Sequence, residues 1–397
     1  MKEKEHGGIR PIGRVQRIAG AYIAYVIGSG FATGQEIVRF FTKYGEKGIL
    51  GILLAAILLA WVGAGLLKDG EQNSESGAKG VYVFYCGGNV GKLFEIFTLM
   101  ALFLTVVVMI SGAGAAFREY CGTPYPFGCV LMTAAVFASY ILGFRRIVDA
   151  IGSLAPLIVL FMGTVSLMTL ARNGMPDWNI AKIFFEGAAP EGAQSRGMIH
   201  SWWFSAVLYV SYNTASAVPF FHALGKEAES SSEAAAGGIV GTALLMGTAL
   251  LSNLAFLSSG EEIGSLSIPM LYLAGKISPV FSTGFAVVLF IEIFSTAAPM
   301  MWTFCSRFAR EGTRKARMVG ILFIIPVYLL SRFSFESLVA LVYPASGFFG
   351  LIFLFCFLRT KLSGSFKRRG SGVLPYDTVY GTIIKNHRRT EKARREK

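Results

Sequence analysis

The sequence has few charged residues and few residues that bind metals or phosphates. Asp, Glu, Lys and Arg make up 15% of the 397 residues, only four are histidine, and 53% are hydrophobic. The five cysteines form no CxxC pair and have no metal-ligand spacing with histidine. No GxxxxGK(S/T) sequence is present to hold nucleotide phosphates. These absences argue against a soluble multidomain enzyme, and they predict a chain without ATP, catalytic residues or a cofactor.

Long apolar segments dominate the sequence instead. A membrane-spanning helix needs about 20 mainly apolar residues. Ten such segments are expected, at 16–44, 48–67, 92–117, 126–143, 146–171, 197–224, 234–257, 280–305, 316–333 and 336–358. The sequence therefore predicts an all-α polytopic membrane protein.

The net charge of +13 is concentrated in the two tails. Residues 1–17 hold five basic and two acidic residues, and residues 359–397 hold twelve and three, so the tails carry +3 and +9. Basic residues beside a span mark the cytoplasmic side and an anionic lipid surface. With both termini inside, 28 of the 37 Lys and Arg residues are cytoplasmic. This pattern predicts a multi-pass plasma-membrane protein with lipid-contacting tails, and it argues against nucleic-acid binding.

Two segments contain sequences that make poor continuous helix. The first has GSGFATG at 28–34, and the sixth has SYNTAS at 211–216, followed by Pro219. Unwound backbone at membrane depth is tolerated only where it is buried in protein or lines a polar cavity. Each break opens a set of five segments, and an odd number inserts the second set upside down. Such paired breaks indicate the midplane site of a secondary transporter.

This interpretation divides the chain into five parts. They are a basic cytoplasmic tail at 1–15, a first five-helix repeat at 16–172, an extracellular loop at 173–196, an inverted second repeat at 197–358, and a basic cytoplasmic tail at 359–397 that is expected to be disordered.

The first segment carries a family resemblance. AGAYI at 19–23 and VIGSGFATGQE at 26–36 resemble the first helix of the YkvI-like bacterial membrane proteins, which have no established substrate. IGSGF at 27–31 is also similar to the first helix of the amino acid/polyamine/organocation (APC) superfamily. Over residues 16–358 the wider resemblance is to the LeuT fold, with five plus five inverted helices and broken helices 1 and 6. It implies a secondary transporter of the bacterial inner membrane, although a fold does not fix a substrate.

The first break is the strongest candidate for a substrate site. A half-helix amino terminus near Thr33 would offer free amide groups and a positive dipole end to an anion such as a substrate carboxylate. The candidate substrate-binding residues are Gly28, Ser29, Gly30, Phe31 and Thr33 in the first segment, and Ser211, Tyr212, Asn213 and Ser216 in the sixth. The alternative is that the glycines only allow close packing and the polar residues form an ordinary helix interface.

The LeuT-fold resemblance also implies a sodium site. Hydroxyls of Ser295 and Thr296 in the eighth segment would act with carbonyls of Ala24 and Ile27. Alternatively, the two hydroxyls bond back to their own helix. Glu292 offers proton coupling instead, because an ionisable residue at membrane depth is costly and is a functional candidate by default.

Three residues are candidates for a gate. Glu36 and Arg39 lie three residues apart and could pair on one helix face, and Trp203 lies near the outer end of the sixth segment. Residues 267–278 are too short to span the bilayer and are expected to form an outer re-entrant or amphipathic helix.

The function predicted from these features is secondary active transport of a small organic solute by alternating access. The expected solute is an amino acid or a related zwitterion, taken up by symport with Na⁺ or H⁺. A transporter-like receptor or sensor is the main alternative, and a membrane-embedded enzyme is the weaker one.

Overall fold

The computed structural model describes residues 11–72, 80–142, 155–176, 201–260, 263–264, 266–309 and 312–362. Most of the predicted amino-terminal tail, extracellular loop and carboxy-terminal tail falls outside these ranges, as does the start of the predicted fifth segment. The helices are α1 (Pro11–Val26), α2 (Ser29–Thr33), α3 (Gln35–Phe40), η1 (Thr42–Tyr44), α4 (Glu46–Gln72), α5 (Val81–Cys86), α6 (Gly88–Cys121), α7 (Tyr125–Leu142), α9 (Ala155–Asn173), α11 (Trp202–Gly225), α12 (Ser231–Ser259), α13 (Pro269–Ile277), α14 (Pro279–Ser306), α15 (Arg314–Leu330) and α16 (Phe335–Leu362).

The helices follow the predicted apolar segments. Each of the ten predicted ranges overlaps helix in the part that the structure describes, although the first is divided among α1, α2, α3 and η1. Six of the described helices are long and apolar enough to cross a membrane, namely α4, α6, α7, α12, α14 and α16. The short helix expected at 267–278 is present as α13, whereas α5 was not predicted. The chain is therefore a multi-pass, all-helical membrane protein.

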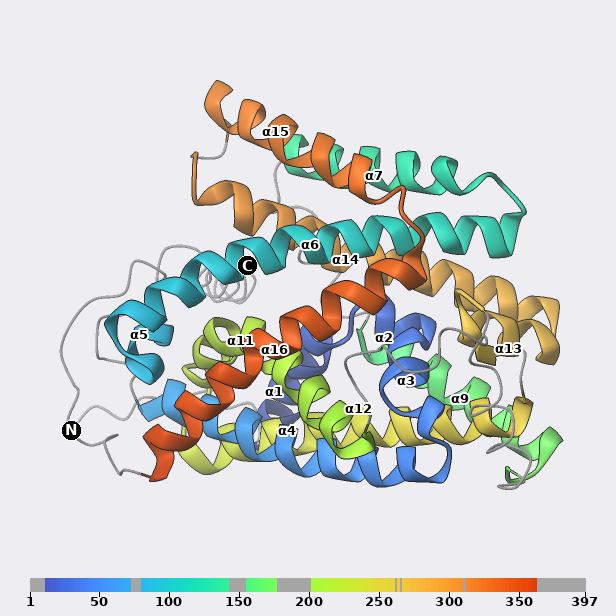
Figure 1. The fold of residues 1–397 in the computed structure, drawn as a ribbon, viewed down its shortest axis with the longest axis horizontal. Helices are drawn as coiled ribbons and strands as arrows, with labels where there is room; N and C mark the ends of the chain where they lie inside the picture. Colours follow the sequence, from blue (N-terminus) through green and yellow to red (C-terminus); the bar gives the residue numbers. More distant parts are fainter. Residues whose placement is uncertain are drawn as a thin grey trace, which may run out of the picture.

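The helices pack as a bundle around α1 and α11. Helix α11 packs against α4 and α16, and α1 packs against α12. In Figure 1, α4 and α12 run along one long side of the bundle, whereas α6 and α14 lie on the other side with α7 and α15 beyond them. The broken first segment thus lies between the two groups of helices.

Glycines allow the central helices to approach closely. A Cβ atom at Gly225 of α11 would clash with the Leu67 carbonyl of α4, and one at Gly70 of α4 would clash with the His222 carbonyl of α11. A Cβ at Gly350 of α16 would clash with the backbone of α11. Backbone atoms cannot move aside as a flexible side chain does, so these contacts require glycine.

The first segment is interrupted at the place that its sequence indicated. Helix α1 ends at Val26, and Gly28 has an extended backbone with φ −124° and ψ −179°. After five residues, α2 ends at Gly34, whose φ of +89° is left-handed and favours glycine. A third short helix, α3, follows. Three helical pieces therefore replace one continuous span.

The break predicted at 211–216 is wrong, because α11 is continuous from Trp202 to Gly225. The polar side chains in this stretch bond to carbonyls one turn earlier. Ser211 Oγ donates to the Val207 carbonyl at 2.7 Å, and Asn213 Nδ2 donates to the Tyr209 carbonyl at 3.0 Å. Ser and Asn can thus be satisfied inside a helix without unwinding it.

Pro219 is also accommodated within α11. A proline has no N–H, so the carbonyl four residues earlier, that of Ala215, loses its helical partner. The hydroxyl of Tyr82, in α5, donates to that carbonyl at 2.7 Å. The hydroxyl of Tyr25, in α1, donates to the next carbonyl, that of Ser216, at 2.8 Å. The Tyr82 hydroxyl therefore replaces the bond that the proline removes, and Tyr25 adds one at the next carbonyl.

Candidate functional site

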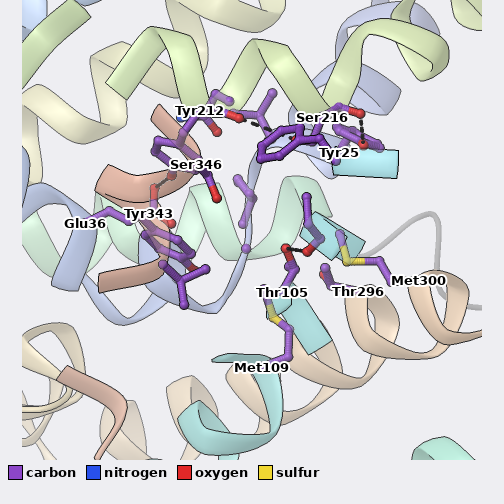
Figure 2. A pocket seen from close by; sticks show the side chains of 17 residues that line it. Tyr25, Glu36, Thr105, Met109, Tyr212, Ser216, Thr296, Met300, Tyr343 and Ser346 are labelled. Carbon is purple, nitrogen blue, oxygen red and sulfur yellow. Dashed lines mark hydrogen bonds between the residues drawn. The ribbon is translucent and has the colours of Figure 1, made fainter. Parts of the chain in front are cut away.

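A cavity lies beside the interruption of the first segment (Figure 2). Its volume is about 60 Å³. Five of the long segments and α3 contribute to it. The lining residues are Tyr25, Val26, Ile27, Gly28, Glu36, Phe97, Ala101, Thr105, Met109, Tyr212, Asn213, Ser216, Thr296, Met300, Val342, Tyr343 and Ser346.

Glu36 is the only acidic residue in this lining, and it is buried. Its side chain is 2% exposed. One carboxylate oxygen accepts a hydrogen bond from the Tyr212 hydroxyl, and the carboxylate also accepts one from the Phe31 backbone amide. A Cβ atom built on Gly30 would lie 2.5 Å from Glu36 Oε1 and 2.6 Å from Tyr343 Cε2. The carboxyl group is therefore pressed against the backbone of α2, directly after the interruption.

Stacked aromatic rings form much of the cavity wall. The rings of Tyr212 and Tyr343 stack with centroids 5.0 Å apart and 6° between their planes. Tyr25 stacks on Phe220 at 4.4 Å. Phe97 stacks on Phe349 of α16, with the two ring centroids 4.7 Å apart. Stacking against a neighbour fixes the orientation of each lining ring.

The cavity wall contains no basic residue. None of the 17 lining residues is Lys, Arg or His. Within the described part of the chain, Glu36 forms no ion pair. The nearby Arg39 side chain turns away, and its Nη2 donates to the Glu336 carbonyl at 3.5 Å. The predicted pairing of Glu36 with Arg39 is therefore not formed.

The predicted substrate residues divide into two groups. Gly28, Tyr212, Asn213 and Ser216 line the cavity. The remaining five do not line it, although all are buried next to it: Ser29, Gly30, Phe31, Thr33 and Ser211. Within α2, the Thr33 hydroxyl donates to the Gly30 carbonyl at 3.2 Å, which ties that side chain to its own helix.

The residues predicted to bind the coupling ion also fall into two groups. Ile27 and Thr296 line the same cavity, whereas Ala24 and Ser295 do not. The Ser295 hydroxyl donates to the Glu292 carbonyl of its own helix at 2.9 Å. Glu292 itself is 2% exposed, and within the described residues its carboxyl group accepts no hydrogen bond and forms no ion pair. It lies one helical turn from Thr296, on the same face of α14.

The predicted gate residues occupy different places. Glu36 belongs to the cavity, whereas Trp203 is 52% exposed and packs edge-on against Phe204. Glu119 of α6, which was not a predicted gate residue, contacts the segment just before α13. Glu119 accepts hydrogen bonds from the amides of Ser267 and Ile268 at 2.9 and 3.2 Å.

The loop that bears Ser267 is tied to two more elements. The Ser267 hydroxyl donates to the Glu336 carboxylate of α16, and Gln35 Nε2 of α3 donates to the Leu266 carbonyl. Helix α6 contributes residues 97–109 to the cavity and Glu119 to this loop, so the loop lies beyond one end of the cavity.

Comparison with known proteins identifies relatives over nearly the whole chain. No family model matches the sequence. The uncharacterized membrane protein YkvI of Bacillus subtilis (strain 168) is 25% identical over 351 residues, which cover 88% of this chain and 96% of YkvI. The uncharacterized protein YyaD of the same organism is 21% identical over 342 residues, with 86% and 95% covered. The homologues are YkvI-like membrane proteins. The resemblance read from residues 19–36 is thereby confirmed.

Solved structures share the fold at low sequence identity. MhsT in complex with L-phenylalanine aligns with a TM-score of 0.58 and 16% identity, covering 88% of this chain and 89% of MhsT. The inward-facing conformation of Mhp1 aligns with a TM-score of 0.53 and 14% identity, covering 91% and 80%. Both are LeuT-fold transporters. This chain therefore shares the LeuT-like helical fold.

Several lining residues were not predicted from the sequence. They come mainly from α6 and α16 and comprise Tyr25, Val26, Phe97, Ala101, Thr105, Met109, Met300, Val342, Tyr343 and Ser346. A signal was present in α16, where Tyr343, Pro344 and Ser346 interrupt an otherwise apolar stretch. In α6 the wall residues recur every four positions, at 97, 101, 105 and 109. That spacing places them on one helix face.

Proposed function

We propose that the chain is a secondary active transporter that moves a small organic solute across the plasma membrane by alternating access. The observation that carries the proposal is the buried cavity at the Ile27–Gly28 interruption, lined by helices from both halves of the sequence. A cavity beside a discontinuous helix is the expected form of a transporter's midplane site. The LeuT-like fold of the YkvI-like chain supports the same function.

The size of the cavity supports a small solute. Its volume is about 60 Å³. An amino acid or related zwitterion, the class that the sequence predicts, shares an ammonium group with simple amines, and Glu36 is placed to accept such a group. We therefore take amino acids and amines together as the compounds to test.

Coupling to a proton is supported more strongly than coupling to sodium. A buried carboxyl group with no partner within the described residues, Glu292, is a costly feature that a proton relay would explain. The sodium alternative needs four residues, and only Ile27 and Thr296 of these line the cavity. We propose H⁺ as the coupling ion, carried by Glu292.

Uptake into proteoliposomes tests the proposed function. With an inward proton gradient, at least one labelled amino acid or small amine is expected to accumulate above its outside concentration. Empty liposomes are the control. A receptor or sensor would bind a compound from this panel without accumulating it, and a membrane-embedded enzyme would convert it. Either outcome would contradict the transporter proposal.

The proposed topology is ten spans in two inverted sets of five, with both termini cytoplasmic and the basic tails at anionic lipid. Cysteines placed at Glu5 and at Thr390, in a background without the natural cysteines, are expected to react with a membrane-impermeant maleimide only after the cells are opened. Labelling of either position on intact cells would contradict the inverted arrangement.

A further inference from the structure

We propose that the cavity recognises a small organic monocation, an amine or quaternary ammonium ion without a carboxylate of its own, and that Glu36 is its counter-ion. This inference rests on the proposed function, since it names the solute of the same cavity. Glu36, the four aromatic rings of the wall and the absence of basic lining residues carry it together.

Glu36 occupies the place where a substrate carboxylate was expected. The free amides after a helix break attract an anion. Here the Phe31 amide, in the first turn of α2, already bonds to the Glu36 carboxylate. The same carboxylate fills the space above Gly30, where even a methyl group would meet it. The protein therefore supplies its own anion at the break, and a second carboxylate from a solute would meet a like charge.

When ionised, Glu36 would be the one charged side chain in the cavity lining. Glu36 faces a wall without Lys, Arg or His, and Tyr212 is a neutral partner. A buried carboxylate is costly unless it is paired. In a site that binds and releases solute, a cationic solute supplies the missing charge in the bound state. An anion or a net-neutral zwitterion would leave either its own or the protein's carboxylate unpaired.

The aromatic wall suits an organic cation better than a metal ion. Tyr25, Phe97, Tyr212 and Tyr343 contribute rings to the wall (Figure 2 labels the three tyrosines). A cation near an aromatic face is attracted by the ring quadrupole, and quaternary ammonium groups are bound in this way. A bare metal cation would need a cage of oxygen ligands. Here methionine and aliphatic side chains interrupt the polar groups, as Met109, Met300 and Val342 show.

The first test compares three ligands of nearly one shape on the purified full chain. They are choline, its uncharged carbon analogue 3,3-dimethylbutan-1-ol, and glycine betaine, which adds a carboxylate. Isothermal titration is expected to show choline binding at least about tenfold tighter than either of the others. Equal binding of choline and the uncharged analogue would overturn the inference, as would tighter binding of glycine betaine.

Tetramethylammonium and ethylammonium extend the comparison to two cations smaller than choline. If neither they nor choline bind, the inference is wrong. A separate titration compares sodium chloride with potassium chloride. Binding of sodium without binding of any organic cation would also overturn the inference.

Variants then assign the charge to one residue. Glu36→Gln is expected to weaken choline binding at least about tenfold while leaving the uncharged analogue unaffected. Glu46→Gln, which removes an exposed carboxylate at the start of α4, is the matched control and should bind choline normally. Unchanged choline affinity in a folded Glu36→Gln variant would overturn the assignment. Should that variant fail to fold, the three-ligand comparison on the unmodified chain still decides.

Binding and uptake together separate the two proposals. Choline binding without uptake of any compound would leave the cation site standing and remove the transporter. Uptake of a zwitterion with no affinity for choline would leave the transporter standing and remove the cation site.

Discussion

Gly30→Ala is expected to lower solute uptake roughly 10- to 100-fold. Overpacking by an added methyl group costs about 1–3 kcal/mol, and each 1.4 kcal/mol corresponds to about a tenfold change. The added methyl would lie 2.5 Å from Glu36 Oε1 and 2.6 Å from Tyr343 Cε2. Neither group can retreat freely, because Glu36 is held by the Tyr212 hydroxyl and Tyr343 is stacked on the Tyr212 ring. Initial uptake rates in proteoliposomes measure the effect.

Two other glycines of the same segment serve as controls for this variant. A methyl at Gly20 would meet no atom within 4 Å, so Gly20→Ala should transport normally. A methyl at Gly28 would meet only the flexible end of Met109, at 2.9 Å, so Gly28→Ala should have a mild effect. Normal uptake by a well-folded Gly30→Ala protein would show that the space above α2 is not part of the site.

Glu292→Gln is expected to abolish accumulation of solute against its gradient. Glutamine keeps the shape of the side chain but cannot take up and release a proton. Solute should then equilibrate across the membrane, and an imposed proton gradient should no longer raise its internal concentration. The ratio of internal to external label at steady state measures this loss directly.

Ser295→Ala is the companion variant for the coupling ion. Its hydroxyl already bonds to its own helix and lies outside the cavity lining, so proton coupling predicts little change. Sodium coupling predicts instead that this variant loses sodium-driven uptake and that Glu292→Gln keeps its full accumulation. Those two results together would reject proton coupling in favour of the predicted sodium site, to which Thr296 belongs.

The first break illustrates what local sequence can predict. The glycines and the serine at 28–30, inside an apolar run, indicate an interruption because they favour extended backbone at membrane depth. The structure has the interruption at Ile27 and Gly28. The position of each long helix was equally predictable, since length and hydropathy define a span locally.

The sixth segment illustrates what local sequence cannot predict. Its polar run and Pro219 resemble a break, but the helix continues because Tyr82 and Tyr25 supply hydrogen bonds from other elements. Those tyrosines lie 133 and 191 residues away from the carbonyls that they satisfy. No window of the sequence contains that information.

Glu36 shows the same limit for the site. Its sequence position suggested a gate residue paired with Arg39, three positions on. Only the turn at Gly34 directs the carboxyl group back onto α2, and only the packing of α16 brings Tyr343 against it. Some residues of the site could therefore be predicted from the sequence. Their grouping into one cavity depends on the tertiary fold.

Counterflow in proteoliposomes tests the central claim most directly. Vesicles are loaded with unlabelled choline, diluted into a trace of labelled choline without an ion gradient, and followed over time. A carrier with one alternating site predicts a transient rise of internal label above the outside concentration, absent in empty vesicles and reduced in Glu36→Gln. A monotonic approach to equal concentrations, or no entry of label for any amine or amino acid tested in the same way, would contradict the account.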